Sequence, residues 1–196
     1  MTKKEIIWRE ILHQALSNRQ SQFTQKELAE KFHLSTSTVF NALKTPRKLG
    51  AVKVTGRFFQ LTNFEKLLHL WASFRKFSAD TIYQTHAGSS VLEIEKNMPS
   101  DVTFGAYTAF KMQFKEVPAD YDKVYVYSNN VLEIEKRFPR EEGYINLITL
   151  KEDSFLKNYG SLTTPAQTFV DLWNLPEWYA QDFWKNLEQK IDAILA

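Results

Sequence analysis

A run of cationic side chains lies in a stretch of the chain that has no acidic residue. No Asp or Glu occurs between Glu30 and Glu65, and the cations in that interval are Lys31, Lys44, Arg47, Lys48, Lys53 and Arg57. DNA carries a dense row of phosphates, and cations without competing carboxylates gain affinity for it by displacing condensed counterions. The chemistry that this spacing predicts is binding of double-stranded DNA.

The charge balance divides the chain near the same place. Residues 1–62 contain 11 Lys and Arg against 4 Asp and Glu, a net charge of +7, whereas residues 63–196 contain 14 against 19, a net of −5. Such asymmetry is typical of a chain of which one part binds nucleic acid. We predict a basic domain over residues 1–62, a joining helix over 63–78 and an α+β domain over 79–196.

Apolar spacing and capping residues predict the elements that position the cations. Apolar residues at helical spacing indicate a first helix over residues 2–17. Thr24 stands three residues before Glu27, a capping-box pair that begins a second helix. Ser35 is a good N-cap for a third helix over residues 36–43.

The third helix is followed by two short β-prone runs around Thr55, Gly56 and Arg57, which predict a hairpin with glycine in its turn. His33 stands in the turn before the third helix, where many helix-turn-helix motifs have glycine. Histidine is among the residues seen more often at positive φ, so this turn remains feasible. The whole arrangement resembles the winged-helix family.

The winged-helix resemblance implies that the third helix lies in the major groove while the hairpin reaches the DNA backbone or an adjacent minor groove. Asn41 suits bidentate recognition of adenine, and Phe40 suits contact with a thymine methyl. The residues that we expect at the groove are Ser35, Thr36, Ser37, Phe40, Asn41 and Lys44. The cations expected to contact phosphates are Lys44, Arg47, Lys48, Lys53 and Arg57.

Two alternatives to DNA binding remain for this region. The basic run could be only a solvated surface, with Phe40 packed under the hairpin, or the winged helix could dock a protein. The aromatic side chains near the C-terminus, which include Trp178, Tyr179 and Phe183 on a helix expected from Pro176, most simply close a core. Their alternative role is a homodimer surface, which would suit an operator with repeated half-sites.

The second domain contains an internal repeat. Residues 91–96 and 131–136 both read VLEIEK, each with a capping side chain before it and a proline soon after it, at Pro99 and Pro139. This chemistry predicts two short helices. Within each copy the two glutamates are two residues apart, so on a helix they point in different directions. We therefore expect these side chains to lie on solvated helix faces and not to form a catalytic dyad. They are Glu93, Glu95, Glu133 and Glu135.

A strand over 102–104 that turns at Gly105 into a helix, a strand around Val124 and a strand over 144–150 complete the predicted second domain. The order of elements resembles the AbiEi-family antitoxins of type IV toxin-antitoxin systems. The segments that carry the resemblance, besides the winged helix and the joining helix, are FGAYTAF at 104–110, VYVYS at 124–128 and TPAQTFVDLW at 164–173. The last stretch is similar to the family's Pro-x-Gln-x-x-x-Asp-Leu-Leu pattern at Pro165, Gln167, Asp171 and Leu172.

The AbiEi resemblance implies a repressor that binds repeats at its own promoter and counteracts a nucleotidyltransferase-like toxin without necessarily forming a stable complex. It also implies that the second domain is a nucleotidyltransferase scaffold without activity. Nucleotidyl transfer needs paired carboxylates that hold magnesium. Asp120 and Asp122 precede the Val124 strand and do not lie on it, so we favour a surface loop for them. The alternative is that they hold magnesium and that the protein is an enzyme acting on nucleotides.

Several other classes of protein are disfavoured. There is no Cys, which excludes disulfides, thiolate nucleophiles and Cys-based metal sites. The four His have no metal-ligand spacing, and no phosphate-binding loop or nucleophile elbow occurs. We therefore expect no enzymatic activity, no cofactor and no metal. Charges throughout the N-terminal stretch and the lack of long apolar runs predict a cytoplasmic protein without a membrane partner.

Overall fold

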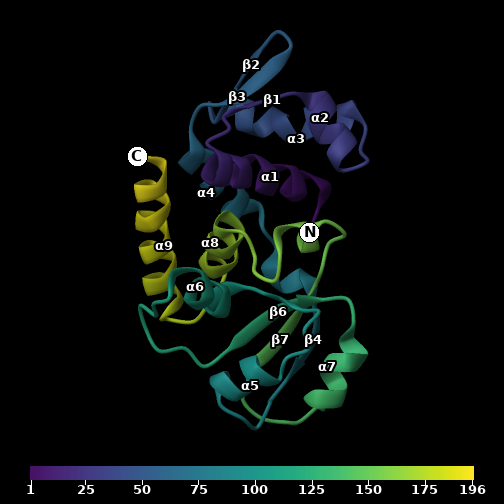
Figure 1. Ribbon diagram of the computed structural model, residues 1–196, viewed down its shortest axis with the longest axis vertical. Helices are drawn as coiled ribbons and strands as arrows, with labels where there is room; N and C mark the ends of the chain where they lie inside the picture. The colour runs from purple at the N-terminus through teal and green to yellow at the C-terminus, as the bar shows by residue number, and fades with distance from the viewer. The chain divides into compact units, whose positions relative to one another are not determined.

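The computed structural model describes residues 1–196 and divides into two compact units (Figure 1). Unit 1 comprises residues 1–75 and 190–196, and unit 2 comprises residues 76–189. Each unit combines helices with one small sheet, so the α+β class predicted from the sequence is confirmed. None of the helices combines the length and the apolar character needed to cross a bilayer.

Unit 1 is built from helices and a three-stranded antiparallel sheet. Its elements are α1 Lys3–Asn18, β1 Gln22–Phe23, α2 Gln25–Lys31, α3 Thr36–Lys48, β2 Val52–Thr55, β3 Phe58–Leu61 and α4 Phe64–Phe74. The strands lie in the order β1-β3-β2, and the β2–β3 hairpin projects beyond the helices of this unit (Figure 1). Strand β1 was not predicted, because two residues are too short to show an alternating pattern.

Local capping chemistry sets the boundaries of the helices in unit 1. The side chain of Thr24 accepts a hydrogen bond from the backbone N–H of Glu27 at 3.1 Å, which begins α2 as predicted. Ser35 accepts from the backbone N–H of Thr38 at 3.2 Å and begins α3. Between the two helices, His33 has φ 51°, the positive value that its place in the turn requires.

Helix α3 continues five residues beyond its predicted end and contains Pro46. Proline cannot donate to the carbonyl four residues before it, which here belongs to Ala42. The indole Nε1 of the buried Trp8 donates to that carbonyl instead, at 2.9 Å. The prediction ended the helix too early because the donor that replaces the proline N–H comes from α1, far away in the sequence.

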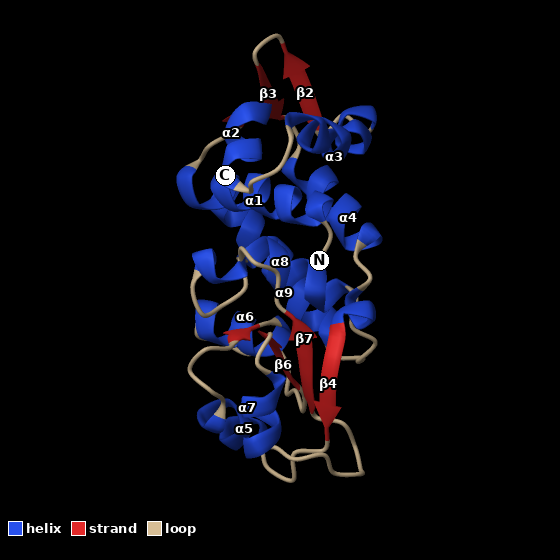
Figure 2. Cartoon of the chain, turned by 90° about the vertical axis from the view of Figure 1, so that its right-hand side faces the viewer, coloured by secondary structure: helices blue, strands red, loops and turns tan.

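Unit 2 is built around a four-stranded mixed sheet in the order β4-β7-β6-β5 (Figure 2). Strands β6 and β7 are parallel, and the two outer pairs are antiparallel. The elements are β4 Thr81–Thr85, α5 Val91–Asn97, β5 Thr103–Phe104, α6 Ala106–Phe114, β6 Val124–Ser128, α7 Val131–Arg137, β7 Leu147–Lys151, α8 Pro165–Trp173 and the first part of α9 Ala180–Leu195, whose residues from 190 onward belong to unit 1. Two short 3₁₀ turns span Phe77–Asp80 and Leu156–Tyr159.

The two faces of the unit 2 sheet are covered by different helices. Val124 and Val126 of β6 join one buried cluster with Ile94 of α5 and Ile134 of α7. Alternate residues of a strand point to opposite faces, and Tyr127 of β6 accordingly meets α8 on the other face. Both VLEIEK copies are short helices, as predicted, and both lie on one side of the sheet.

The prediction that the glutamates of the VLEIEK repeat lie on solvated helix faces is wrong for Glu95. This side chain is buried and accepts hydrogen bonds from the hydroxyls of Thr108 at 2.8 Å and Tyr121 at 2.6 Å. Its counterpart Glu135 lies at the surface, 3.3 Å from Arg140. The same six-letter sequence thus carries one buried and one exposed glutamate, because the partners come from elsewhere in the chain.

The hydrogen bond from Trp8 to Ala42 can be tested through the stability of unit 1. Trp8→Phe is expected to lower the free energy of unfolding by about 1–3 kcal/mol, because it leaves a buried carbonyl unpaired. In a Pro46→Ala background the restored backbone N–H can reach that carbonyl, so Trp8→Phe should cost less there. Urea unfolding of the four proteins measures the coupling, and equal costs in both backgrounds would contradict the interpretation.

Candidate nucleic-acid interface

Every side chain that the sequence assigned to the DNA surface is exposed, and most of them share one face of α3. The members on α3 are Thr36, Ser37, Phe40, Asn41, Lys44, Arg47 and Lys48. At about 100° per residue they fall within an arc of roughly 140°. The opposite side of the helix is buried through Val39, Ala42, Leu43 and Pro46. Helix α3 thus packs with one face and presents a face free of carboxylates with the other.

Ser35 contributes to this surface indirectly. Its hydroxyl oxygen caps α3, and it also lies 2.9 Å from the hydroxyl of Ser37 and 2.9 Å from that of Thr38. These contacts fix the first turn of the helix. Ser35 therefore positions Ser37 at the start of the exposed face.

Phe40 lies beside Lys44 on the exposed face of α3. The ammonium nitrogen of Lys44 is 5.3 Å from the centroid of the Phe40 ring, a cation–π distance. The ring is 40% exposed and so is not packed under the hairpin, as one alternative interpretation supposed.

The hairpin turn and the start of α3 line the same depression, which has a volume of about 260 Å³. Thr36, Gly56 and Arg57 form part of its wall, together with the first turn of α2. Gly56 has φ 55°, and a methyl group at its Cα would meet no atom within 4 Å, so the turn is open to a neighbouring molecule.

Lys26 also lines this depression, although the sequence did not indicate it. It lies on α2, outside the acid-free stretch, and its ammonium group is 3.7 Å from the carboxylate of Glu30. Both side chains are largely exposed, so their ion pair is weak and leaves Lys26 free to exchange partners. Only the folded chain brings Lys26 close to the hairpin turn.

Lys31 is a cation of the acid-free stretch that has an internal partner. Its ammonium nitrogen lies 2.5 Å from a carboxylate oxygen of Glu10, which is buried on α1. The sequence could not show this pair, because its members are far apart in the chain. The other five cations, Lys44, Arg47, Lys48, Lys53 and Arg57, form no ion pair within the protein.

The two carboxylates of the alternative interpretation as magnesium ligands belong to no larger group of candidate metal ligands. Asp120 and Asp122 precede β6, and Asp122 accepts a hydrogen bond from the hydroxyl of Tyr179. Burial, followed by that hydrogen bond to Asp122, raises the pKa of the Tyr179 phenol. No group of three or more His, Asp or Glu side chains is arranged to hold a metal ion.

A buried network surrounds Glu177 in unit 2. Its carboxylate accepts hydrogen bonds from Tyr107 at 3.0 Å, Tyr125 at 3.0 Å and the ammonium group of Lys123 at 2.6 Å. Burial, and then the charge of Glu177, raises the pKa of both phenols. No sequence pattern marked this network, because its donors come from separate parts of the chain. Tyr107 lies in α6, Tyr125 lies in β6 and Lys123 directly precedes β6.

The Glu177 network also explains an incorrect helix start. The last helix was expected from Pro176, but α9 begins at Ala180. The side chains of Glu177 and Tyr179 are hydrogen-bonded to Tyr107 and Asp122, respectively, and their backbone forms turns in place of a helical turn. Strand β7 likewise begins at Leu147, three residues later than predicted.

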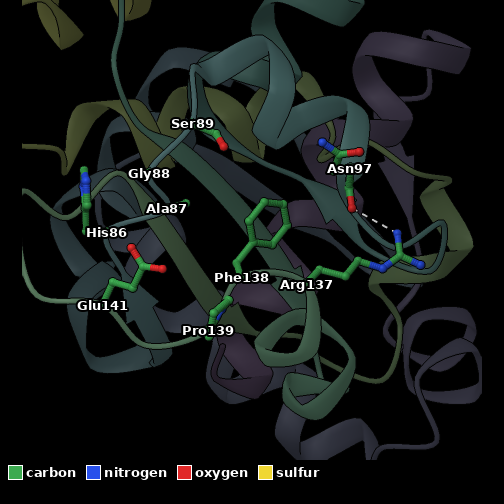
Figure 3. Close-up of a pocket in the computed structure, with 9 residues that line it drawn as sticks. All are labelled: His86, Ala87, Gly88, Ser89, Asn97, Arg137, Phe138, Pro139 and Glu141. Carbon is green, nitrogen blue, oxygen red and sulfur yellow. Dashed lines mark hydrogen bonds between the residues drawn. The ribbon is translucent and has the colours of Figure 1, made fainter.

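A depression in unit 2 has a different character from the α3 face (Figure 3). Its volume is about 680 Å³, and its wall includes His86, Asn97, Arg137 and Glu141. Arg137 donates to the backbone carbonyl of Asn97 at 3.0 Å, so part of its hydrogen-bonding capacity is used internally. With a carboxylate and a guanidinium in one wall, this depression has no single charge preference.

Comparisons with known proteins find nothing similar to this chain. A scan of protein families finds none that matches, and searches of curated proteins and of solved structures find no match either.

The Glu177 network predicts a measurable loss of stability in unit 2. Glu177→Gln is expected to lower the free energy of unfolding by about 1.5–3 kcal/mol, because a charged acceptor of three donors becomes neutral. Chemical unfolding followed by near-ultraviolet circular dichroism would measure it. Glu142→Gln, at an exposed glutamate, is the matched control and should change little. Equal effects of both substitutions would argue against the network.

Proposed function

We propose that this protein is a DNA-binding transcriptional regulator and that unit 1 is a winged helix-turn-helix domain. The observation that carries the proposal is the exposed face of α3, which joins three cations to hydroxyl and amide side chains without a carboxylate. The order helix, strand, two helices and hairpin supports the winged-helix assignment.

The contacts divide into positioning and recognition. Lys44, Arg47 and Lys48 on α3, with Lys53 and Arg57 on the hairpin, contact phosphates and fix the register of the protein on DNA. The side-chain amide of Asn41 donates one hydrogen bond to the major-groove edge of adenine and accepts another from it. Because the five cations form no ion pair within the protein, binding does not require an ion pair to be broken first.

Binding should depend steeply on salt. If four or five phosphates are neutralised, the logarithm of the affinity falls with the logarithm of the salt concentration with a slope of about −4. Fluorescence anisotropy with duplexes from the region upstream of the gene, at several salt concentrations, measures this slope. Absence of binding even at low salt would overturn the proposal.

Substitutions separate the two kinds of contact. Arg47→Glu and Arg57→Glu should weaken binding to all sequences, whereas Asn41→Ala should mainly relax the preference at one base pair. Lys96→Glu, at an exposed lysine of unit 2, is the matched charge reversal and should leave affinity unchanged. Unaltered binding by both arginine variants would contradict the proposed orientation of α3 and the hairpin.

We further propose that the regulator is a cytoplasmic antitoxin that represses its own operon and counteracts a nucleotidyltransferase-like toxin. This part rests on the AbiEi resemblance of the sequence. Expression of the neighbouring gene alone should stop growth, and coexpression of this protein should restore it. If the neighbouring product is harmless, the antitoxin assignment fails while the DNA-binding proposal stands.

A second candidate function is protein docking, including association of two copies, and the observation that favours it is Trp178. This side chain is 80% exposed and stands between Glu177 and Tyr179, whose side chains are hydrogen-bonded to Tyr125 and Asp122, respectively. A rigidly presented tryptophan is typical of the centre of a protein interface. Stable retention of a protein partner without DNA would favour this function.

A further inference from the structure

Phe40 is the apolar member of the otherwise polar face of α3. At about 100° per residue it falls between Arg47 and Lys44, inside the exposed arc and not at its edge. Phe40 does not belong to the buried core of unit 1. Its exposed fraction of 40% leaves apolar area that contact with another molecule would remove from water.

The ring of Phe40 is held in place by its own helix. It forms no aromatic pair, and its contact with Lys44 spans one helical turn, the spacing at which side chains of a helix meet. The ammonium group lies over the ring at 5.3 Å from its centroid. The pair therefore presents a cation and an apolar edge side by side.

We propose that Phe40 selects thymine in the major groove by contact with the C5-methyl group, while Lys44 neutralises a nearby phosphate. The inference rests on the proposed DNA binding through α3. Among the groups that base pairs present in the major groove, the thymine methyl is the apolar one, and the others are hydrogen-bond donors and acceptors.

The same contact disfavours other bases. A donor or acceptor pressed against the Phe40 ring would lose its hydrogen bond to water without replacement, which carries a cost. The neighbouring residue Asn41 presents an amide that suits adenine. Phe40 and Asn41 together predict thymine and adenine at adjacent positions of the bound site.

Replacement of thymine by deoxyuridine tests the proposal, because it removes the methyl group and keeps the hydrogen-bonding edges. The probe is the tightest-binding duplex selected by the wild-type protein from a random 20-base-pair pool, synthesised with either base. The wild-type protein should bind the deoxyuridine duplex about fourfold more weakly for each methyl group contacted. Phe40→Ala should bind the thymine duplex more weakly than wild type does, and should bind both duplexes equally.

Two further variants make the result specific. Leu49→Ala truncates a similarly exposed apolar side chain at the end of α3, off the proposed face, and should keep the wild-type ratio between the duplexes. Lys44→Gln should weaken binding to both duplexes by the same factor and reduce the salt slope by about one.

The outcomes separate this inference from the function on which it rests. If no duplex binds at low salt, the DNA-binding proposal itself fails. If the wild-type protein binds both duplexes equally, DNA binding stands and the role of Phe40 is wrong. A preference for thymine that persists in Phe40→Ala would also overturn the inference, since another group would then sense the methyl.

Discussion

The hydrogen bond from Trp8 to the carbonyl of Ala42 is the interaction on which the candidate surface depends. Pro46 removes the backbone donor that this carbonyl would use, and a buried carbonyl without a donor costs stability. Because Trp8 supplies the donor from α1, α3 continues to Lys48. Arg47 therefore lies on one helical face with Thr36 and Lys44. The cationic surface thus depends on a hydrogen bond in the core.

The elements that the sequence predicted correctly are those set by neighbouring residues. Caps at Thr24 and Ser35, positive φ at His33 and the two VLEIEK helices all depend on contacts within a few residues. The features that it missed depend on residues distant in the chain. Glu10 holds Lys31, a cation of the acid-free stretch, and the fold brings Lys26, which lies outside that stretch, to the hairpin. Charge composition locates a surface but does not say which charges are already paired.

The state of pairing distinguishes the buried glutamates of unit 2 from the cations of the candidate surface. In unit 2, Glu95 and Glu177 are buried acceptors with several donors each, so their charges are used within the fold. Groups satisfied in this way contribute to stability and have little to offer a ligand. The five cations of α3 and the hairpin have no such partners and face solvent. Their charge therefore remains available for an external anion.

Unpaired cations on one rigid helix raise its electrostatic free energy, and binding of an anionic partner would lower it again. Lys44, Arg47 and Lys48 repel one another, although exposure and salt keep this repulsion small. Phosphates would relieve it and release counterions, which makes a polyanion a better partner than a single carboxylate. Phosphate contacts alone would bind all DNA equally. Selectivity must therefore come from the neutral side chains of the same face, Phe40 and Asn41, whose positions α3 fixes relative to the cations.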